Sequence, residues 1–320
     1  MSLSIIIPHF NKPDLLEKLL VSIPQDKIDI QTIVVDDQSE TLYLDEVKKL
    51  KNKYNFELYQ NHIKKSAGLC RNLGLQKAKN NWVIFADGDD YFTNGFYDKV
   101  SKYFDKKIDV VFFPPTSQYL DTGKTAGRHL SFKKIIQDYL NDKNKKNELL
   151  LRYSFISTWS KMMKKEFMNK HSIKFDEGPM GAEDVLMSTK IGFFMKYFDV
   201  CSEVIYCLIT RHGSSTRVLN QVQFDIRLNA RISRINFLKA HLDKTEQILI
   251  KPLIYNKAAE LLLKSFKQFG LKKFLKVYTL YRKENIKWFR LIYLNPFKVI
   301  RYIFIGYNNY LKNNKYRIKN

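Results

Sequence analysis

Three carboxylates within four positions follow directly on an apolar stretch of the chain. The stretch Trp82–Ala86 is apolar throughout, which predicts a buried strand, and Asp87, Asp89 and Asp90 come immediately after it. Carboxylates this close together repel one another and raise each other's pKa, so a bound cation would stabilise them. Mg²⁺ and Mn²⁺ bind oxygen ligands, commonly one or two carboxylates together with phosphate oxygens. The cluster therefore predicts a site for a divalent metal and a diphosphate. An acidic surface turn is the alternative, because Asp and Gly are common in turns.

Side chains that could bind a ligand also follow the first two predicted strands. Phe10 and Asn11 follow the strand Ser4–Pro8, and Asp36 and Asp37 follow the next β-branched run. In an open α/β sheet, ligands bind beyond the carboxyl ends of the parallel strands. We therefore expect these residues on the same rim as the acidic cluster. Carboxylate oxygens are suitable acceptors for a nucleobase or a ribose; a helix cap or a loop acid is the alternative.

A basic residue lies in the first turn of a helix predicted over Gly68–Lys79. This residue is Arg71. A helix N-terminus favours anions through its N–H groups and its dipole, and a guanidinium group matches a phosphate or a base edge. Arg71 is therefore a candidate donor-binding residue, with an ordinary surface arginine as the alternative.

Two polar pairs stand out in the second half of the chain. Glu183 and Asp184 begin an apolar helix predicted over 182–194, which makes them candidates for a general base. Acids that complement the helix dipole are the alternative. Arg211 and His212 follow the last predicted strand and could contact a diphosphate, or they form a basic turn.

The elements that must position these residues alternate between strand and helix over the first 113 residues. Such alternation predicts an α/β fold, with a mostly parallel central sheet, right-handed crossovers and flanking helices. Beyond about residue 220, strand signals cease and helical periodicity continues, so we expect a domain boundary near 218. The first predicted helix begins at Asn11–Asp14 and has an apolar face that extends to Ile23. The later predicted helices cover 43–54, 68–79, 95–104, 131–147 and 182–194. Predicted strands cover 4–8, 32–35, 56–59, 82–86, 109–113 and 200–208, and 114–127 is a predicted loop.

The chain resembles the family 2 glycosyltransferases, enzymes of the Rossmann-like GT-A fold. The resemblance covers residues 3–95 well and about 150–215 more loosely, and it rests on four segments in the family's order and spacing. These segments are IIIPHFN at 5–11, VVDDQS at 34–39, CRNLG at 70–74 and DGDD at 87–90.

The resemblance implies a donor site. It implies that Asp37 contacts the base of a nucleotide-sugar donor, with Arg71 beside it. Asp87 would face the ribose, and Asp89 would hold the Mn²⁺ or Mg²⁺ ion that bridges the diphosphate. The implied donor site also includes Pro8, Phe10, Asn11, Asp36, Gly88, Arg211 and His212, and the implied metal ligands are Asp89 and Asp87.

The resemblance also implies an acceptor half over residues 114–218, opposite a nucleotide-sugar half over 1–113. There Asp184 would be the general base, with Glu183 orienting the site. Trp159 and Lys161 precede them in the family's order and are the candidate acceptor contacts.

The implied reaction is an inverting, metal-dependent transfer of a sugar, favouring a UDP-sugar donor. The acceptor would be a hydroxyl of a growing surface glycan, free or lipid-linked, such as lipopolysaccharide, lipooligosaccharide or capsule. No Gln-x-x-Arg-Trp run is present, which favours a non-processive enzyme. A sugar-nucleotide nucleotidyltransferase is one alternative, although the Gly-rich loop expected after its first strand is missing. A catalytically inactive glycan- or membrane-binding scaffold is another, and the intact acids weigh against it.

Positive charge is concentrated at the end of the chain. The net charge is +23, and residues 231–320 hold 21 Lys and Arg against 4 Asp and Glu, a net of +17. These residues belong to a longer region, 219–320, in which aromatic and branched residues alternate with basic ones at helical spacing. Such a pattern is typical of helices in membrane interfaces. We expect these helices to bind an anionic membrane surface. Packing on the catalytic domain or on a second copy, as in a homodimer, is the alternative, and no nucleic-acid-binding module accompanies the charge.

The sequence favours a cytoplasmic protein bound peripherally to the inner face of the cell membrane. No signal peptide is evident, and no window reaches the length of a transmembrane helix. The three cysteines suggest no disulfide framework, which fits a reducing compartment.

Overall fold

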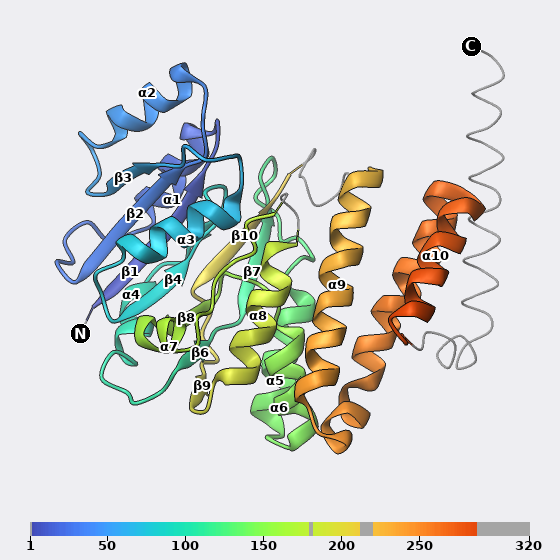
Figure 1. The fold of residues 1–320 in the computed structure, drawn as a ribbon. Coiled ribbons are helices and arrows are strands. Elements are labelled where there is room, and N and C mark those ends of the chain that lie inside the picture. The colour runs from blue at the N-terminus through green and yellow to red at the C-terminus, as the bar shows by residue number, and fades with distance from the viewer. Residues whose placement is uncertain (1, 179–181, 212–219, 287–320) are drawn as a thin grey trace, which may run out of the picture. The chain divides into compact units, whose positions relative to one another are not determined.

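The computed structural model describes residues 2–178, 182–211 and 220–286, and the chain divides into two compact units, Met1–Leu219 and Asn220–Asn320. The first unit has strands and helices in alternation, and the predicted α/β class is confirmed (Figure 1). The predicted donor residue His212 lies outside the described residues.

A seven-stranded sheet forms the centre of the first unit, in the order β3-β2-β1-β4-β8-β6-β9. β1 pairs in parallel with β2 and β4, and β2 with β3, whereas β8 runs antiparallel to β4 and β6. The sheet is therefore mostly parallel, as expected. Its strands are β1 (Leu3–His9), β2 (Ile30–Asp36), β3 (Glu57–Gln60), β4 (Trp82–Phe85), β6 (Val110–Phe112), β8 (Lys161–Lys164) and β9 (Phe198–Val200).

Helices cover both faces of this sheet. Ile5 and Ile7 of β1 belong to a buried cluster with Leu16 of the first helix, whereas Ile6 belongs to a second cluster with Cys70. Continuous apolar strands are expected where a parallel sheet is covered on both sides. The helices are α1 (Pro13–Val21), α2 (Thr41–Leu50), α3 (Ala67–Lys77), α4 (Phe96–Ser101), α5 (Leu130–Asn141), α6 (Lys145–Ser154), α7 (Lys165–Lys170) and α8 (Glu183–Phe194).

Several elements differ from the sequence expectation. A strand at Pro115–Tyr119 lies within the loop expected over 114–127, and β8 was not expected as a strand. The strand expected over 200–208 is divided between β9 and β10 (Tyr206–Thr210), which belong to different sheets. β10 lies in a second sheet, of order β5-β10-β7, with β5 (Tyr91–Phe92) and β7 (Pro115–Tyr119). The helix expected over 131–147 is divided into α5 and α6, because Asn144 caps α6 by accepting a hydrogen bond from a backbone nitrogen at 2.8 Å.

Two long helices form the described part of the second unit. These are α9 (Gln221–His241) and α10 (Lys244–Lys283), and the side chains of Asn220 and Asp243 cap their first turns. Gly270 kinks α10 with a φ of 81°, a backbone conformation that glycine adopts without steric cost. No helix in the described ranges is both long enough and apolar enough to cross a membrane.

Candidate active site

The carboxyl ends of β1, β2 and β4 meet at one edge of the central sheet. His9 and Asp36 are opposite each other in the register of β1 and β2, and Ile6 of β1 is opposite Phe85 of β4. The backbone nitrogen of Asp37 donates a hydrogen bond to the carbonyl oxygen of His9 at 2.8 Å. The loops after these strands therefore lie side by side.

Asp36 and Asp37 are both held by protein groups. Asp36 is fully buried, with one carboxylate oxygen 3.0 Å from His9 Nδ1 and the other accepting from the Ser39 backbone nitrogen at 2.9 Å. Burial raises the pKa of Asp36, but the hydrogen bonds outweigh burial and the pKa lies below its usual value. Asp37 Oδ1 accepts a hydrogen bond from Asn61 Nδ2 at 2.8 Å. Both side chains are buried, with Asp37 5% exposed, so they support the loop from within, and their contact with a donor stays a prediction.

Arg71 joins the loop after β4 to the start of α8. Its Nη2 donates to Asp87 Oδ1 at 2.8 Å, and its Nη1 donates to Glu183 Oε1 at 3.2 Å. The side chain is almost fully buried, with its guanidinium carbon 5.3 Å from the centre of the Phe175 ring. Burial lowers the pKa of Arg71, but Asp87 and Glu183 raise it above its usual value. A permanently charged group therefore connects two loops that are far apart in the chain.

The acidic loop turns one carboxylate inward and leaves two partly exposed. Asp90 is buried, and its Oδ1 accepts a hydrogen bond from the Ile209 backbone nitrogen at 2.7 Å. Burial and the charges of Asp87 and Asp89 raise the pKa of Asp90 well above its usual value. The side chains of Asp87 and Asp89 are 31% and 33% exposed, and Asp89 Oδ2 lies 2.5 Å from Arg211 Nη2. These two carboxylates are accessible to a ligand.

The two exposed carboxylates fit a metal that is shared with a substrate. Within the described ranges, no three His, Cys, Asp or Glu side chains are grouped closely enough to hold a metal ion. Mg²⁺ is commonly bound through one or two carboxylates together with substrate phosphates. Asp87 and Asp89 therefore suit a cation bound with a diphosphate, and not one enclosed by protein ligands.

Glu183 and Asp184 occupy the first turn of α8. Glu183 Oε2 accepts a hydrogen bond from the Ala182 backbone nitrogen at 2.9 Å, and Oε1 contacts Arg71. The Asp184 carboxylate acts to raise the pKa of both Arg71 and Lys161, so its charge lies near both cations. The two acids thus lie beside the acidic loop, and the role of general base stays a prediction.

Trp159 and Lys161 lie beneath the site. The Trp159 ring is 7% exposed and stacks on Tyr206, with ring centres 5.9 Å apart. Lys161 is 1% exposed, and its Nζ donates to Phe155 O at 2.8 Å and to Ser188 Oγ at 3.1 Å. Burial lowers the pKa of Lys161 to about 7. Both side chains expose little surface to an acceptor, and their contact with an acceptor stays a prediction.

The loop after β1 completes the edge. Phe10 is 39% exposed, and the Lys65 ammonium lies over its ring, 4.2 Å from the ring centre. The Asn11 side chain donates to Glu40 Oε1 and accepts from the Glu40 backbone nitrogen, both at 2.9 Å. A Cβ atom at Gly88 would lie 3.0 Å from the Pro8 carbonyl oxygen, so glycine allows the acidic loop to pack closely on this strand end.

The model of Glycosyl transferase family 2 matches residues 4–171, just over half of the chain. The matched segment includes the loops after β1, β2 and β4. The chain belongs to glycosyl transferase family 2. The resemblance inferred from the four sequence segments is thereby confirmed.

Curated relatives of this family 2 chain include enzymes of bacterial glycan synthesis. Poly(ribitol-phosphate) beta-N-acetylglucosaminyltransferase TarS of Staphylococcus aureus is 24% identical over 260 residues, which are 78% of this chain and 43% of TarS. The chain therefore spans less than half of the length of that relative. The cholesterol galactosyltransferase of Borreliella burgdorferi is 24% identical over 291 residues, covering 83% of this chain and 72% of the relative.

Solved structures show the same fold. Residues 1–349 of S. aureus TarS in complex with UDP-GlcNAc match with a TM-score of 0.69 at 20% identity, covering 87% of this chain and 79% of that one. The mannosyltransferase PcManGT of Pyrobaculum calidifontis in complex with GDP-Man and Mn²⁺ matches with a TM-score of 0.50 at 16% identity, covering 97% and 87%. The expected GT-A fold is confirmed.

The sequence analysis did not identify one residue that contacts the acidic loop, Tyr206. The hydroxyl of Tyr206 in β10 accepts a hydrogen bond from the Asp87 backbone nitrogen at 2.8 Å and also bonds to the Asp90 side chain. A tyrosine inside an apolar strand is the only available signal, because a buried hydroxyl usually has a partner.

Proposed function

We propose that this chain is an inverting, metal-dependent, non-processive glycosyltransferase, which transfers a sugar from a nucleoside-diphosphate sugar to a hydroxyl of a cell-surface glycan. The observation that supports this best is the double ion pair of Arg71 with Asp87 and Glu183. It holds the acidic loop, which would bind the donor, next to the helix start that carries the candidate base. Such positioning of two reactants is a major source of catalysis.

The donor would lie along the edge formed by β1, β2 and β4. Phe10, whose ring now faces the Lys65 ammonium, would stack on the base. The Asp37 carboxylate, which already accepts from Asn61 and Ser66, would meet the polar edge of the base. Pro8, Asn11 and Gly88 shape this edge, and Arg211 lies against Asp89 at the diphosphate end. We favour a UDP-sugar, because the structure of TarS that matches this fold contains UDP-GlcNAc.

Asp89 and Asp87 would hold Mn²⁺ or Mg²⁺ together with the diphosphate. When bound, this ion supplies positive charge that stabilises the leaving diphosphate. Arg211, which pairs with Asp89, would contact a diphosphate oxygen. The Mn²⁺ of PcManGT supports a divalent ion in a related fold.

Asp184 would accept the proton of the acceptor hydroxyl as that oxygen attacks the anomeric carbon. Glu183 would orient the site through its hydrogen bonds with Arg71 and the Ala182 nitrogen. One displacement from the face opposite the diphosphate inverts the anomeric centre. Proton transfer of this kind is worth about 10²–10⁴ in rate.

The acceptor would be a bacterial surface glycan, either free or lipid-linked. We favour lipopolysaccharide, lipooligosaccharide or capsule, and the name of TarS, which refers to a poly(ribitol-phosphate), supports a surface polymer of this kind. The catalytic unit would comprise residues 1–218, with a nucleotide-sugar half and an acceptor half that divide near 113.

The basic region 219–320 would bind an anionic membrane surface on the cytoplasmic side. Within α10, Leu271 and Leu275 are exposed, and Lys272 and Lys276 follow each of them directly. Exposed leucines flanked by lysines suit a lipid interface, where each Lys adds about 1 kcal/mol of attraction to anionic headgroups. A homodimer contact through the same helix is the competing use of this surface.

Thermal unfolding with UDP, GDP, dTDP and CMP and their sugars, each with Mn²⁺ or EDTA, tests this proposal. A ligand at 100 times its dissociation constant should add about 2.7 kcal/mol of stability. We expect stabilisation by one nucleotide, lost in EDTA, and a product of inverted anomeric configuration. Stabilisation that is equal in EDTA would exclude the metal, and no stabilisation by any nucleotide, with or without anionic vesicles, would leave a non-catalytic scaffold.

A further inference from the structure

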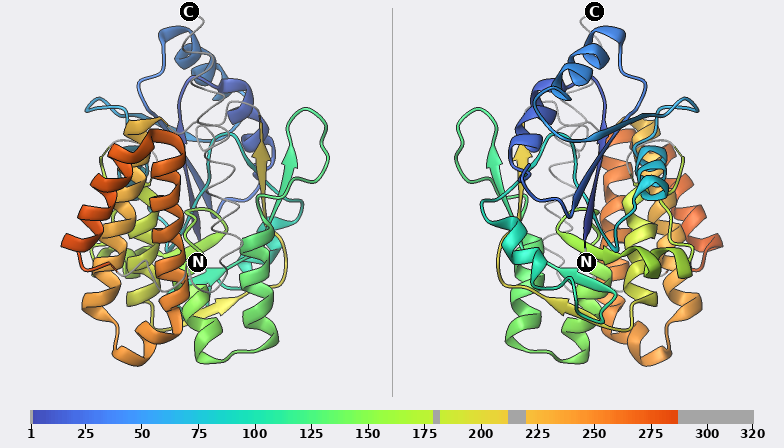
Figure 2. Two further views of the ribbon diagram at one scale, coloured as in Figure 1. Left: turned by 90° about the vertical axis from the view of Figure 1, so that its right-hand side faces the viewer. Right: turned by 90° about the vertical axis from the view of Figure 1, so that its left-hand side faces the viewer.

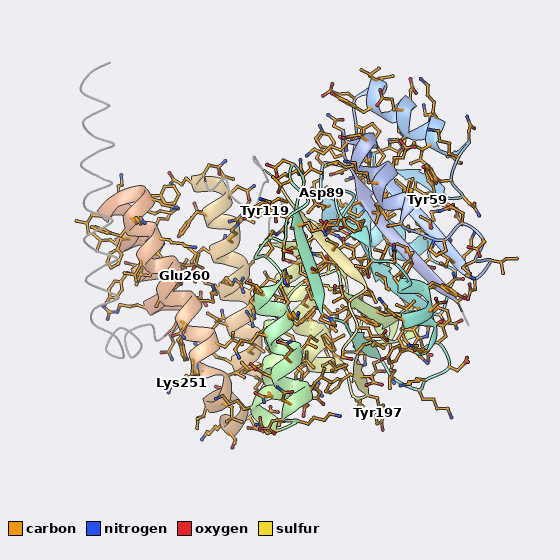
Figure 3. All side chains as sticks on the ribbon, turned by 180° about the vertical axis from the view of Figure 1, so that it is seen from behind. Tyr59, Asp89, Tyr119, Tyr197, Lys251 and Glu260 are labelled. Carbon is orange, nitrogen blue, oxygen red and sulfur yellow. The ribbon has the colours of Figure 1, made fainter. Side chains whose placement is uncertain are left out.

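A hydrogen bond joins the buried lysine Lys161 of β8 to the helix that carries the candidate base. Its Nζ donates to Ser188 Oγ of α8 at 3.1 Å. Ser188 comes four positions after Asp184, and residues at this spacing lie on the same face of a helix. Figure 3 shows Asp89 near one end of the first unit and Tyr197, which follows α8, near the other. Helix α8 therefore begins at the edge of the candidate site, and Lys161 binds its second turn.

The same ammonium group also binds the end of α6. Lys161 Nζ donates to the carbonyl oxygen of Phe155, the C-cap residue of α6, at 2.8 Å. Ser188 Oγ in turn donates to Ser157 O, in the loop after α6, at 3.1 Å. Helices α3 and α6 both pack against α8 (Figure 2). The Lys161 ammonium thus connects β8, α6 and α8 at a buried point behind the start of α8.

The backbone immediately before Lys161 has an unfavourable conformation. Ser160 has a φ of 55°, in the left-handed region that residues other than glycine rarely adopt, and it is fully buried. The Ser160 carbonyl oxygen accepts a hydrogen bond from the Phe113 nitrogen, after β6, at 3.0 Å. A conformation of this kind costs about 1–3 kcal/mol and is found most often at functional sites. The strain at Ser160 therefore supports a functional role for the side chain next to it.

Two cations act on the Asp184 carboxylate from different sides. Asp184 raises the pKa of Arg71 on α3 and of Lys161 on β8, and because the attraction is mutual, both cations favour the ionised form of Asp184. Glu183 adds a like charge on α8 itself, but it pairs with Arg71 at 3.2 Å. Arg71 also pairs with Asp87, whereas the two hydrogen-bond acceptors of Lys161 in the described ranges are uncharged. Lys161 therefore offers a positive charge that these other carboxylates do not share.

We propose that Lys161 is a positioning residue for the general base, which fixes the first turns of α8 through Ser188 and keeps Asp184 ionised through its positive charge. The inference rests on the proposed function, in which Asp184 accepts the proton of the acceptor hydroxyl. A carboxyl group that is already protonated cannot act as this base. Contact with the acceptor is the competing role for Lys161, and its exposure of 1% leaves little surface for such contact.

Carbon-13 NMR of the full chain, labelled at the aspartate carboxyl carbons, tests the charge effect without a substrate. The Asp184 signal is assigned by its loss in Asp184→Asn and is followed through an acid titration. Lys161→Gln keeps a hydrogen-bonding side chain and removes the charge, so Asp184 should become protonated at a pH about one unit higher than in the native chain. Lys164→Gln is the matched control and should cause no shift, because Lys164 lies at the other end of β8 with its Nζ over the Trp82 ring.

Turnover of the same samples tests the positioning effect. The probes are UDP-N-acetylglucosamine, UDP-glucose and UDP-galactose with Mn²⁺, and the UDP released is measured as a function of pH. Lys161→Gln should move the acidic limb of kcat up by the same pH unit, which is about a tenfold loss at a fixed pH on that limb, and leave KM for the donor unchanged. Ser188→Ala should lower kcat without moving the limb, because the charge of Lys161 remains.

The outcomes separate this inference from the proposed function. An Asp184 signal that titrates at the same pH in Lys161→Gln and in the native chain would overturn the inference, and a lower kcat with an unmoved acidic limb in that variant would limit Lys161 to a structural role. If Lys161→Gln does not fold, Ser188→Ala decides, and a kcat equal to the native value would overturn the inference. Absence of nucleotide stabilisation and of UDP release in the native chain would instead refute the proposed function, because the NMR titration depends on neither donor nor metal.

Discussion

The hydroxyl oxygen of Tyr206 lies 2.8 Å from the backbone nitrogen of Asp87 and accepts its hydrogen bond. Tyr206 is fully buried in β10, and it also bonds to the side chain of Asp90. Burial and the charges of Asp90 and Asp87 raise its pKa well above the usual value, so the hydroxyl stays protonated. Through Tyr206, the second sheet thereby holds the acidic loop that follows β4 of the central sheet.

Tyr206→Phe should therefore loosen the acidic loop without changing the ring packing. An unpaired backbone N–H in a buried position costs about 1–3 kcal/mol, so urea unfolding should show a loss of that order. We expect the Mn²⁺ concentration needed for nucleotide-dependent stabilisation to rise in the same variant. A variant with lower stability but unchanged Mn²⁺ dependence would limit Tyr206 to a role in folding.

Asp184→Asn should abolish most turnover and leave donor binding intact. Loss of a general base lowers the rate by about 10²–10⁴, whereas the nucleotide contacts lie elsewhere. Turnover and nucleotide-dependent thermal shifts, measured together, check this. Asp105→Asn is the control, because Asp105 is exposed and lies outside the site. Full activity of Asp184→Asn would refute the base assignment.

Arg71→Met should destabilise the protein strongly. Its removal leaves Asp87 and the partly buried Glu183 without their shared cation, and breaking a buried ion pair in this way costs about 3–5 kcal/mol. Arg71→Lys should recover part of the stability but little activity, because one ammonium group cannot make both fork contacts. Equal activity of the lysine variant and the native protein would contradict a positioning role for the two ion pairs of Arg71.

Lys161 should make stability rise with pH above about 7. Its pKa is lowered from 10.5 to about 7 by burial, so between these values the unfolded chain binds more protons than the folded one. Folding is penalised fully below pH 7, and the penalty disappears as the pH approaches 10.5, with a slope of up to about 1.4 kcal/mol per pH unit. The Asp184 carboxylate raises the pKa of Lys161 and so offsets part of the lowering by burial.

Urea unfolding of the native protein and of Lys161→Met over this pH range measures the slope. The difference in unfolding free energy between the two should change with pH, because methionine removes the titrating group. Lys106→Met is the control, since Lys106 is half-exposed at the surface. A constant difference across the range would show that Lys161 does not titrate with a lowered pKa.

Much of the fold and part of the site could be predicted from local patterns. The apolar runs that end in Asp36 and in Asp87 indicated strands and their polar ends. The spacing of apolar residues and the position of turn residues are local signals that can be identified in the sequence. The break between α5 and α6 was missed, although Asn144 was a capping signal, because the charged run was interpreted as the end of one helix. The antiparallel strand β8 was missed because Lys161 and Lys164 flank only two apolar residues.

The sequence by itself determined the family, the α/β class and the identity of the acids at the strand ends. The tertiary structure decided which of these side chains face a ligand. Asp90 turns inward to the Ile209 nitrogen, Lys161 is buried against Phe155, and Arg71 spans 112 positions to reach Glu183. Spacing along the chain does not encode such contacts, because side-chain direction and burial are set by segments that meet only when the chain has folded.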